Sequence, residues 1–276
     1  MKILSIDVGI KNLAFCLFEK TEKTEYFKIA KWDVVNISEQ EIYNCSFSDK
    51  NGLCNKPAKF KKDDVYFCLK HSKKQNYQIP SSELKPTFIN KQKLKTLYEI
   101  ANSHGVKYEP KIKKTELVAA INDHIYNNYF QEIQSKKASE VNLYNIGTNI
   151  KIHFDKIFSG ENCIDYVIIE NQISPIATRM KTIQGMLVQY FVMCQVNVKN
   201  IEFISASNKL KDCNIKDKTK YSDRKKIGIL KCLETITTDH RFTEKVEYFN
   251  LHKKKDDLAD SFLQGMWFIN NNNNKF

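Results

Sequence analysis

The sequence of 276 residues contains little glycine or proline and no long hydrophobic run. Its eight glycines are spread along the chain with no two close together, which excludes the glycine-rich loops that cradle phosphates in many nucleotide-binding proteins. No segment reaches the roughly 18 consecutive apolar residues of a membrane span, so we expect no helix that crosses a membrane and no partner within a membrane. Asp7 also interrupts the first apolar stretch, where a secretory signal requires unbroken apolar residues. The sequence therefore predicts an intracellular protein.

Acidic residues are also scarce relative to basic ones. Lys and Arg number 44 against 32 Asp and Glu, which gives a formal charge of +12. Such an excess is typical of proteins that bind polyanions, with nucleic acid the first candidate and an anionic membrane surface the second. Hydrophobic residues make up 42%, enough for the core of one large or two modest domains. In a reducing compartment the eight cysteines are expected to be thiols or metal ligands and not disulfides.

The order of the expected elements indicates an α/β protein. Three β-branched and aromatic segments near the start predict a meander of strands over residues 2–10, 12–20 and 25–37. Strands then alternate with helices: we expect helix 137–158, strand 163–172, helix 177–197, strand 200–207, and helices 223–236 and 256–269. Strands that come first and then alternate with helices favour a mixed sheet covered by helices.

A polar segment interrupts this core. We expect the core to comprise residues 1–40 and 137–276, with an insertion made of residues 41–78 and a helical hairpin over residues 88–130. The first part of the insertion has the spacing C-x8-C-x13-C-x2-H, and three thiolates with one imidazole suit structural zinc. The predicted ligands are Cys45, Cys54, Cys68 and His71. The alternative is ordinary buried thiols with a surface histidine, which is our interpretation of Cys16, Cys163, Cys194 and Cys232.

Four acidic residues occupy positions where such a sheet exposes side chains. Asp7 lies within the first strand, where a half-buried carboxylate is costly unless it is paired or binds a metal, and Glu170 lies near the end of a central strand. Asp257 and Asp260 are three residues apart and share one face of the last helix. Such carboxylates suit hard divalent ions, and two ions can clamp a phosphodiester for attack by water.

Some of the charged residues in this region also have a simpler explanation. Asp256 fits best as an acid that favours the helix N-terminus, and Glu170 by itself would fit an ion pair with a basic residue. His252 is four residues before Asp256, but an isolated histidine is more often a surface or capping group than a catalytic one. The case for a metal site rests on the four acids taken together.

Three motifs in order carry a resemblance to a known family. The segments "SIDVGIKNLAF", "VIIENQISPIATRM" and "KKKDDLADSFL" resemble the RuvC-class Holliday junction resolvases of the RNase H-like superfamily, most closely those of poxviruses and other large DNA viruses. The resemblance covers residues 1–37 and about 137–268. It implies an RNase H-like mixed five-stranded sheet flanked by helices, a homodimer, and branched DNA as the partner. It also implies that Asp7, Glu170, Asp257 and Asp260 bind Mg²⁺ or Mn²⁺ and that Gln172 and Arg179 lie near DNA.

Two basic regions are candidates for phosphate contacts. The first lies beside the expected acidic site and consists of Lys218, Lys220, Arg224, Lys225 and Lys226. The second is the hairpin, whose helix, glycine turn and Lys-x-Glu-Leu helix resemble a SAP domain, a small DNA-binding module. Its candidate contacts are Lys111, Lys113 and Lys114, and a purely structural hairpin remains an alternative.

These observations predict a magnesium-dependent endonuclease that resolves four-way DNA junctions by paired hydrolysis. The alternatives are a related nuclease that cuts RNA/DNA hybrids or acts as a transposase, and a DNA-binding protein without catalysis. "SIDVGIKN" is also similar to the phosphate loop of sugar kinases and actin-like ATPases, but the scarcity of glycine excludes that class. The expected location is the site of viral DNA replication or the virion for a viral protein, and otherwise the nucleus or mitochondrion.

Overall fold

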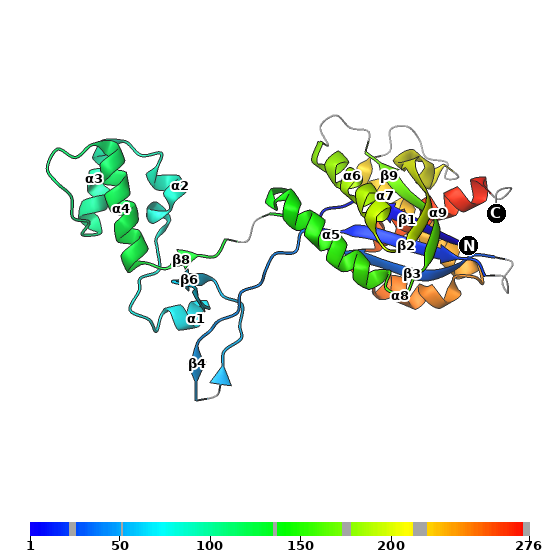
Figure 1. Cartoon of the computed structure of the whole chain (residues 1–276), viewed down its shortest axis with the longest axis horizontal. Coiled ribbons are helices and arrows are strands. Elements are labelled where there is room, and N and C mark those ends of the chain that lie inside the picture. Colours follow the sequence, from blue (N-terminus) through cyan, green and yellow to red (C-terminus); the bar gives the residue numbers. More distant parts are fainter. Residues whose placement is uncertain (22–25, 51, 135–136, 173–177, 212–219, 273–276) are drawn as a thin grey trace. The chain divides into compact units, whose positions relative to one another are not determined.

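The computed structural model describes residues 1–21, 26–50, 52–134, 137–172, 178–211 and 220–272. The chain forms two compact units (Figure 1). The first unit comprises residues 1–40 and 136–276 and contains both termini, and the second comprises residues 41–135. Within the described parts of the chain, no helix has the length and apolar character needed to cross a membrane.

The first unit is built on a mixed five-stranded sheet with the order β10-β9-β1-β2-β3. Antiparallel pairing joins β1 to β2 and β2 to β3, whereas β9 lies parallel to both β1 and β10. The expected meander and the mixed α/β sheet are therefore confirmed. The strands are β1 (Lys2–Asp7), β2 (Leu13–Glu19), β3 (Lys28–Val35), β9 (Cys163–Asn171) and β10 (Asn197–Ser205).

Helices cover both faces of this sheet (Figure 1). Because side chains alternate along a strand, Leu4 and Ile6 of β1 pack on one side while Ile3 faces the other. The first face is covered by α5 (Leu143–Ile157) and α6 (Thr178–Met193). The second is covered by α7 (Tyr221–Thr238), α8 (Val246–Leu251) and α9 (Lys255–Asn271), with the turn η4 (Thr243–Lys245) before α8.

Two helices of the first unit are shorter than the sequence predicted. The helix expected at residue 137 begins at Leu143, because the side chain of Asn142 accepts a hydrogen bond from the backbone N–H of Asn145 and caps it. A 3-10 turn, η2 (Ala138–Glu140), precedes it. The helix expected to reach residue 197 ends at Met193, because Asn197 already pairs with Cys163 at the start of β10.

The second unit combines small β elements with a helical hairpin. Strands β6 (Phe60–Lys62), β7 (Val65–Phe67) and β8 (Gln131–Glu132) form one sheet, and β4 (Ser48–Asp49) pairs with β5 (Gly52–Leu53). The remaining elements are α1 (Leu69–Ser72), η1 (Ser82–Leu84), α2 (Pro86–Ile89), α3 (Leu94–Ser103) and α4 (Lys114–Asn128). The segment 77–86, between the small β elements and the hairpin, contains a 3-10 turn and the start of α2, where Pro86 occupies a position that favours proline.

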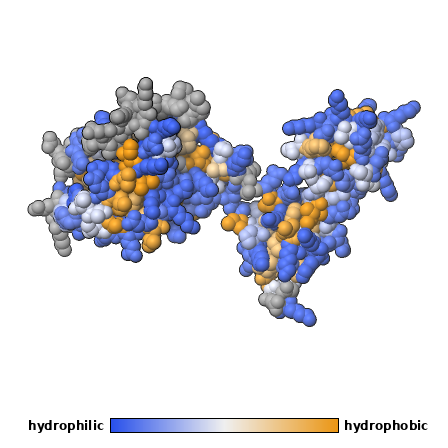
Figure 2. Space-filling view, turned by 180° about the vertical axis from the view of Figure 1, so that it is seen from behind, coloured by the Kyte–Doolittle hydropathy of each residue, from blue (hydrophilic) through white to orange (hydrophobic). Residues whose placement is uncertain are grey.

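The two parts of this unit differ in how they are held together. The hairpin has its own apolar core, which includes Leu97, Leu117 and Ile121. In contrast, residues 41–72 expose several large apolar side chains, including Ile42, Leu53 and Val65. Figure 2 shows hydrophobic surface gathered over this part of the unit. Among the described residues of this segment the buried apolar side chains are those of Cys45, Phe60 and Cys68, so its apolar core is small.

Candidate active site and metal-ligand cluster

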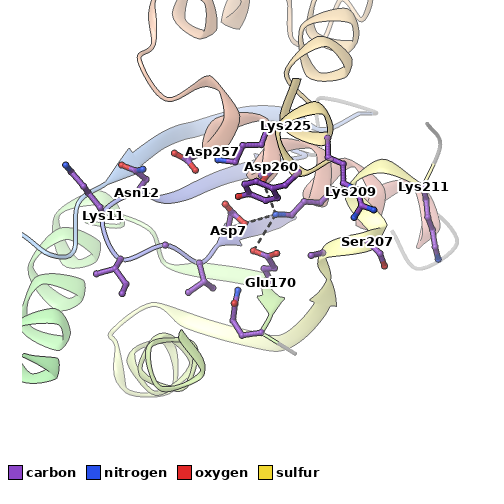
Figure 3. Close-up of a pocket in the computed structure, with 17 residues that line it drawn as sticks. Asp7, Lys11, Asn12, Glu170, Ser207, Lys209, Lys211, Lys225, Asp257 and Asp260 are labelled. Carbon is purple, nitrogen blue, oxygen red and sulfur yellow. Dashed lines mark hydrogen bonds and ion pairs between the residues drawn. The ribbon is translucent and has the colours of Figure 1, made fainter. Parts of the chain in front are cut away.

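Four carboxylates meet where β1, β9 and α9 come together. Asp7 ends β1 on the same face as Ile3, and Glu170 points to the same side of the sheet as Ile168 of β9. That face is the one covered by α9, which supplies Asp257 and Asp260. All four carboxylates line one cleft of about 830 Å³ (Figure 3). The structure thus brings together the four acids that the sequence singled out.

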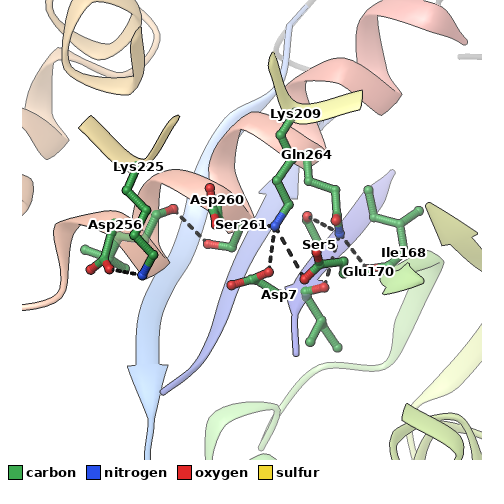
Figure 4. A network of polar contacts seen from close by, with 12 residues as sticks. Ser5, Asp7, Ile168, Glu170, Lys209, Lys225, Asp256, Asp260, Ser261 and Gln264 are labelled. Carbon is green, nitrogen blue, oxygen red and sulfur yellow. Dashed lines mark hydrogen bonds and ion pairs between the residues drawn. The ribbon is translucent and has the colours of Figure 1, made fainter. Parts of the chain in front are cut away.

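A lysine that sequence reasoning missed lies at the centre of these acids. Lys209 comes from the turn η3 (Ala206–Leu210), which directly follows β10. Its Nζ lies 2.6 Å from Asp7 Oδ1, 3.5 Å from Glu170 Oε2 and 3.5 Å from Asp260 Oδ2 (Figures 3 and 4). The available signal was topological: β10 and β9 are parallel, so the residues that follow β10 lie at the edge where Glu170 emerges.

The helix that carries two of the acids is fixed to the sheet by a buried glutamine. Gln264 follows Asp260 by one helical turn, and its Nε2 lies 3.2 Å from Ser5 Oγ and 3.1 Å from the carbonyl oxygen of Ile6 (Figure 4). The next residue, Gly265, lets α9 pack directly on Phe18 of β2. A Cβ atom at this position would lie only 2.2 Å from the Phe18 ring. These contacts set the height of the aspartates above β1.

The acids do not share one protonation state. Burial would raise the pKa of Asp7, but the ammonium of Lys209, the hydrogen bond with Glu170 and the charge of Lys225 together outweigh burial and lower that pKa below its usual range. Burial, followed by the neighbouring Asp7, raises the pKa of Glu170 to about 8. Burial likewise raises the pKa of Asp257 and that of Asp260 to about 6. In the absence of a metal, Glu170 is therefore the acid that holds a proton near neutral pH.

The donor set suits a hard divalent cation. All four candidate ligands are carboxylates, the groups that Mg²⁺ and Mn²⁺ prefer. Asp257 Oδ2 is buried and has no hydrogen-bond partner among the described residues, although buried polar atoms are nearly always paired. An unpartnered carboxylate oxygen in a cleft that already attracts a lysine ammonium is what a cation-binding site requires.

The neighbouring acid and histidine have other roles. Asp256 pairs with Lys225 at 2.5 Å, which lowers the pKa of Asp256 against the effect of burial, so it is an ion-pair partner as well as an acid in the first turn of α9. His252 is not among the residues that line the cleft. Its Nδ1 accepts a hydrogen bond of 3.0 Å from the backbone N–H of Lys254, and its Nε2 lies 3.8 Å from Asp33 Oδ1.

A tight turn forms another wall of the cleft. The turn that connects β1 to β2 lines the cleft with Gly9, Lys11 and Asn12. A Cβ atom at Gly9 would lie 2.1 Å from the carbonyl oxygen of Asn12, so only glycine allows the turn to close.

The residues expected to contact DNA fall into two groups. Gln172, Arg224 and Lys225 line the cleft, together with Tyr221 and Lys211, which the sequence analysis did not identify. Lys220 and Lys226 are exposed but do not line it, and Lys218 lies outside the described residues.

Arg179 is also absent from the cleft lining. It donates a hydrogen bond to the carbonyl oxygen of Val141, and its Nε is buried without a partner in the described part of the chain. The structure therefore does not place Arg179 with the acids.

The second unit contains a separate cluster of metal-ligating side chains. One ligand atom from each of Cys45, Cys54, Cys68 and His71 lies within 4.8 Å of all the others. Cys45 Sγ is 3.4 Å from His71 Nδ1, and Cys54 Sγ is 4.0 Å from Cys68 Sγ. Ligands of tetrahedral zinc are expected to lie roughly 3.8 Å apart, given a Zn–S distance of about 2.3 Å. The cluster therefore fits a tetrahedral ion.

The remaining cysteines differ in burial. Cys16 and Cys232 are fully buried in the core of the first unit, as expected for ordinary thiols, and burial raises the pKa of both. Cys163 and Cys194 are only half-buried.

The lysines of the hairpin lie on its surface. Lys111, Lys113 and Lys114 are all exposed at or just before the start of α4. The backbone N–H of Lys113 donates to Glu116 Oε2, so this lysine also belongs to the helix cap.

The fold and the position of the acids define the class of protein. A sheet of order β10-β9-β1-β2-β3 with β2 antiparallel to its neighbours, and acids on β1, β9 and the last helix, is the RNase H-like arrangement. Residues 3–172 match the family model described as "Mitochondrial resolvase Ydc2 / RNA splicing MRS1". The chain belongs to this family.

Comparisons with individual proteins give similar relatives. An uncharacterised protein of Acanthamoeba polyphaga mimivirus is 27% identical over 314 residues, covering 98% of this chain and 74% of that protein. Among solved structures, the fowlpox virus resolvase in complex with its substrate Holliday junction DNA is 15% identical, with a TM-score of 0.41 and 98% of each chain covered. The yeast mitochondrial Holliday junction resolvase Ydc2 is 12% identical, with a TM-score of 0.42, covering 97% of this chain and 78% of that one.

Proposed function

We propose that this protein is a magnesium-dependent endonuclease that resolves four-way DNA junctions by paired phosphodiester hydrolysis. The observation that carries the proposal is the convergence of four carboxylates in one cleft, one of which has a buried oxygen without a partner among the residues that the structure describes. Membership of a family whose description includes a mitochondrial resolvase supports the substrate class. A DNA-binding protein without catalysis would have no reason to keep a cluster of buried acids, because burying carboxylates side by side costs free energy.

The residues divide the chemical work among themselves. Asp7, Glu170, Asp257 and Asp260 would hold Mg²⁺ or Mn²⁺, which when bound activates the attacking water and stabilises charge on the leaving oxygen. Glu170 must lose its proton to act as a ligand, since its pKa is raised to about 8 in the metal-free site. Gln264 keeps α9 against β1 so that the acids of both elements face the same point.

The rim of the cleft supplies the positive charge that DNA requires. Lys211, Arg224 and Lys225 line the cleft beside the acids, and Tyr221 stands 75% exposed at the same rim. Such cations fix the sugar-phosphate backbone in position without reading sequence. We infer that the scissile strand lies along this rim, with its phosphate above the carboxylates.

A homodimer follows from the substrate. Resolution of a four-way junction needs two cuts on opposite strands, and the acids that line the cleft make one site in each chain. A two-fold symmetric pair of chains would place two such sites on a two-fold symmetric junction. We therefore propose that the active form is a dimer, acting where DNA recombines inside the cell or virion.

In the second unit we propose a structural zinc ion bound by Cys45, Cys54, Cys68 and His71. The spacing of these ligand atoms fits a tetrahedral ion, and residues 41–72 expose apolar side chains that would otherwise form a core. Structural zinc supplies folding free energy directly, which such a segment needs. The hairpin that follows would act as an additional DNA-binding arm through its exposed lysines.

Substitution of the metal ligands tests the proposal. Changing Asp7, Glu170, Asp257 or Asp260 to its amide should lower the rate of junction cleavage more than about a hundredfold. Loss of a residue that only supports a metal ligand already costs about 10–100-fold in activity, and loss of the ligand itself should cost more. Binding of the junction should be largely retained because the basic rim is unchanged. Asp256→Asn is the matched control: it lies on the same helix but outside the cluster, and should cut at close to the normal rate. Near-normal cutting by the Asp7→Asn protein would refute the assignment.

A further inference from the structure

Lys209 is the cation at the centre of the acidic cluster, and its position has a consequence for metal binding. Its Nζ contacts three of the four carboxylates, one from each of the three elements that build the site. The side chain is only 6% exposed, so the ammonium contacts these acids and has little contact with solvent. The contacts therefore join β1, β9 and α9 through a single charged group (Figure 4).

A divalent ion would need the same three carboxylates. An ammonium 2.6 Å from Asp7 Oδ1 occupies the lone pairs of that oxygen and repels any second cation that approaches it. Magnesium binds carboxylate oxygens at about 2.1 Å, closer than the ammonium does, and demands regular geometry around itself. An ion held by Asp7, Glu170 and Asp260 would lie close to the ammonium that contacts the same three carboxylates, and the two positive charges would repel each other.

We propose that Lys209 is a positioning residue that holds the metal ligands together before metal arrives and is displaced from them when metal binds. This inference rests on the proposed metal site and adds a competition between an internal ammonium and the external ion. The lysine has four rotatable side-chain bonds, and Ala206 and Ser207 of η3 line the same cleft. The side chain can therefore withdraw into the cleft by changing rotamer.

The competition makes a quantitative prediction for metal affinity without DNA. The apparent Mg²⁺ affinity equals the intrinsic affinity multiplied by the fraction of molecules in which Lys209 has left the carboxylates. Removing the ammonium makes every molecule competent and should raise Mg²⁺ affinity at least about tenfold. Lys209→Met keeps most of the side-chain volume and removes the charge. Lys211→Met is the matched control, because Lys211 lines the same cleft and the change in net charge is identical, yet its Nζ lies over the ring of Trp267. That control should change the affinity less than about threefold, as expected for the loss of a distant charge.

A second measurement uses the wild-type protein and does not depend on the folding of a variant. Acetic anhydride modifies accessible lysines, and mass spectrometry reports the extent at each one. Lys209 should be protected in EDTA and become at least about fivefold more reactive in saturating Ca²⁺ or Mg²⁺, because displacement exposes it. Lys231, paired with Glu234 on α7 and not among the residues that line the cleft, should keep the same reactivity in both conditions.

The outcomes separate this inference from the proposed function. If metal binds the wild-type protein while the reactivity of Lys209 stays unchanged, the displacement is wrong although the metal site stands. If neither the wild type nor Lys209→Met binds divalent metal in calorimetry, the proposed metal site itself is wrong and the inference falls with it. Equal Mg²⁺ affinity of wild type and Lys209→Met would also overturn the competition.

Discussion

Glu170 makes the stability of the metal-free protein depend on pH in an unusual direction. Its pKa is raised from 4.5 to about 8, first by burial and then by Asp7. A carboxyl whose folded-state pKa exceeds its unfolded value binds a proton more tightly in the native state, so the free energy of unfolding falls as pH rises between the two values. In EDTA, the first unit should therefore lose stability between pH 6 and pH 8.

The size of the effect follows from the pKa. With a folded-state pKa of about 8 and an unfolded carboxyl already ionised at pH 6, ionising Glu170 lowers the free energy of unfolding by about 2 kcal/mol between pH 6 and pH 8. Asp257 and Asp260, each with a pKa of about 6, contribute less over this window. A loss of about 2 kcal/mol corresponds to a decrease in Tm of roughly 4–8 °C for a unit of this size.

Tryptophan fluorescence is a suitable assay. The sequence contains two tryptophans, Trp32 and Trp267, and both lie in the first unit, so urea unfolding monitored by their emission reports that unit alone. Glu170→Gln imitates the protonated side chain and should remove most of the pH dependence. Saturating Mg²⁺ should stabilise the wild type more at pH 8 than at pH 6, because the metal competes with the proton. A wild type in EDTA that is equally stable at both pH values, or more stable at pH 8, would refute the reasoning.

Two further predictions concern the second unit. Protein purified without added zinc should contain about one equivalent of zinc, and Cys68→Ser should lose it and unfold residues 41–72, as measured by elemental analysis and hydrogen exchange; a fully folded preparation without metal would contradict the assignment. Replacing Lys111, Lys113 and Lys114 by Ala should lower junction affinity and reduce the slope of log affinity against log salt by about 2 to 3, with little change in the cutting rate at saturating enzyme. An unchanged slope would show that the hairpin does not contact DNA.

The sequence predicted the parts of the site that follow from local periodicity. Asp7 interrupts an apolar strand, and period two places it on the same face as Ile3. Asp257 and Asp260 share a helix face by their spacing, and the buried Leu258 and Phe262 fix which side of the helix meets the sheet. These features depend on neighbours in the sequence.

Other features depended on contacts between distant segments. Lys209 is one of many lysines, and only the parallel pairing of β10 with β9 brings it to Asp7, 202 residues earlier in the chain. Its motif predicts that Arg179 lies near DNA; in the structure its guanidinium donates a hydrogen bond to the carbonyl oxygen of Val141, and Arg179 does not line the cleft. The predicted start of this helix at residue 137 was wrong. Asn142 is a strong helix cap, and it outweighs the helix-favouring lysines before it, so α5 begins at Leu143.

The most direct test of the account is cleavage of a four-way junction labelled in turn on each strand, in Mg²⁺ and with excess linear competitor duplex. We expect paired nicks placed symmetrically on opposite strands across the branch point, no cutting with EDTA, and no cutting by Asp7→Asn at an enzyme concentration that still binds the junction. Equal cleavage of the linear duplex and the junction under competition would contradict the account, as would preferential cutting of the RNA strand in an RNA/DNA hybrid.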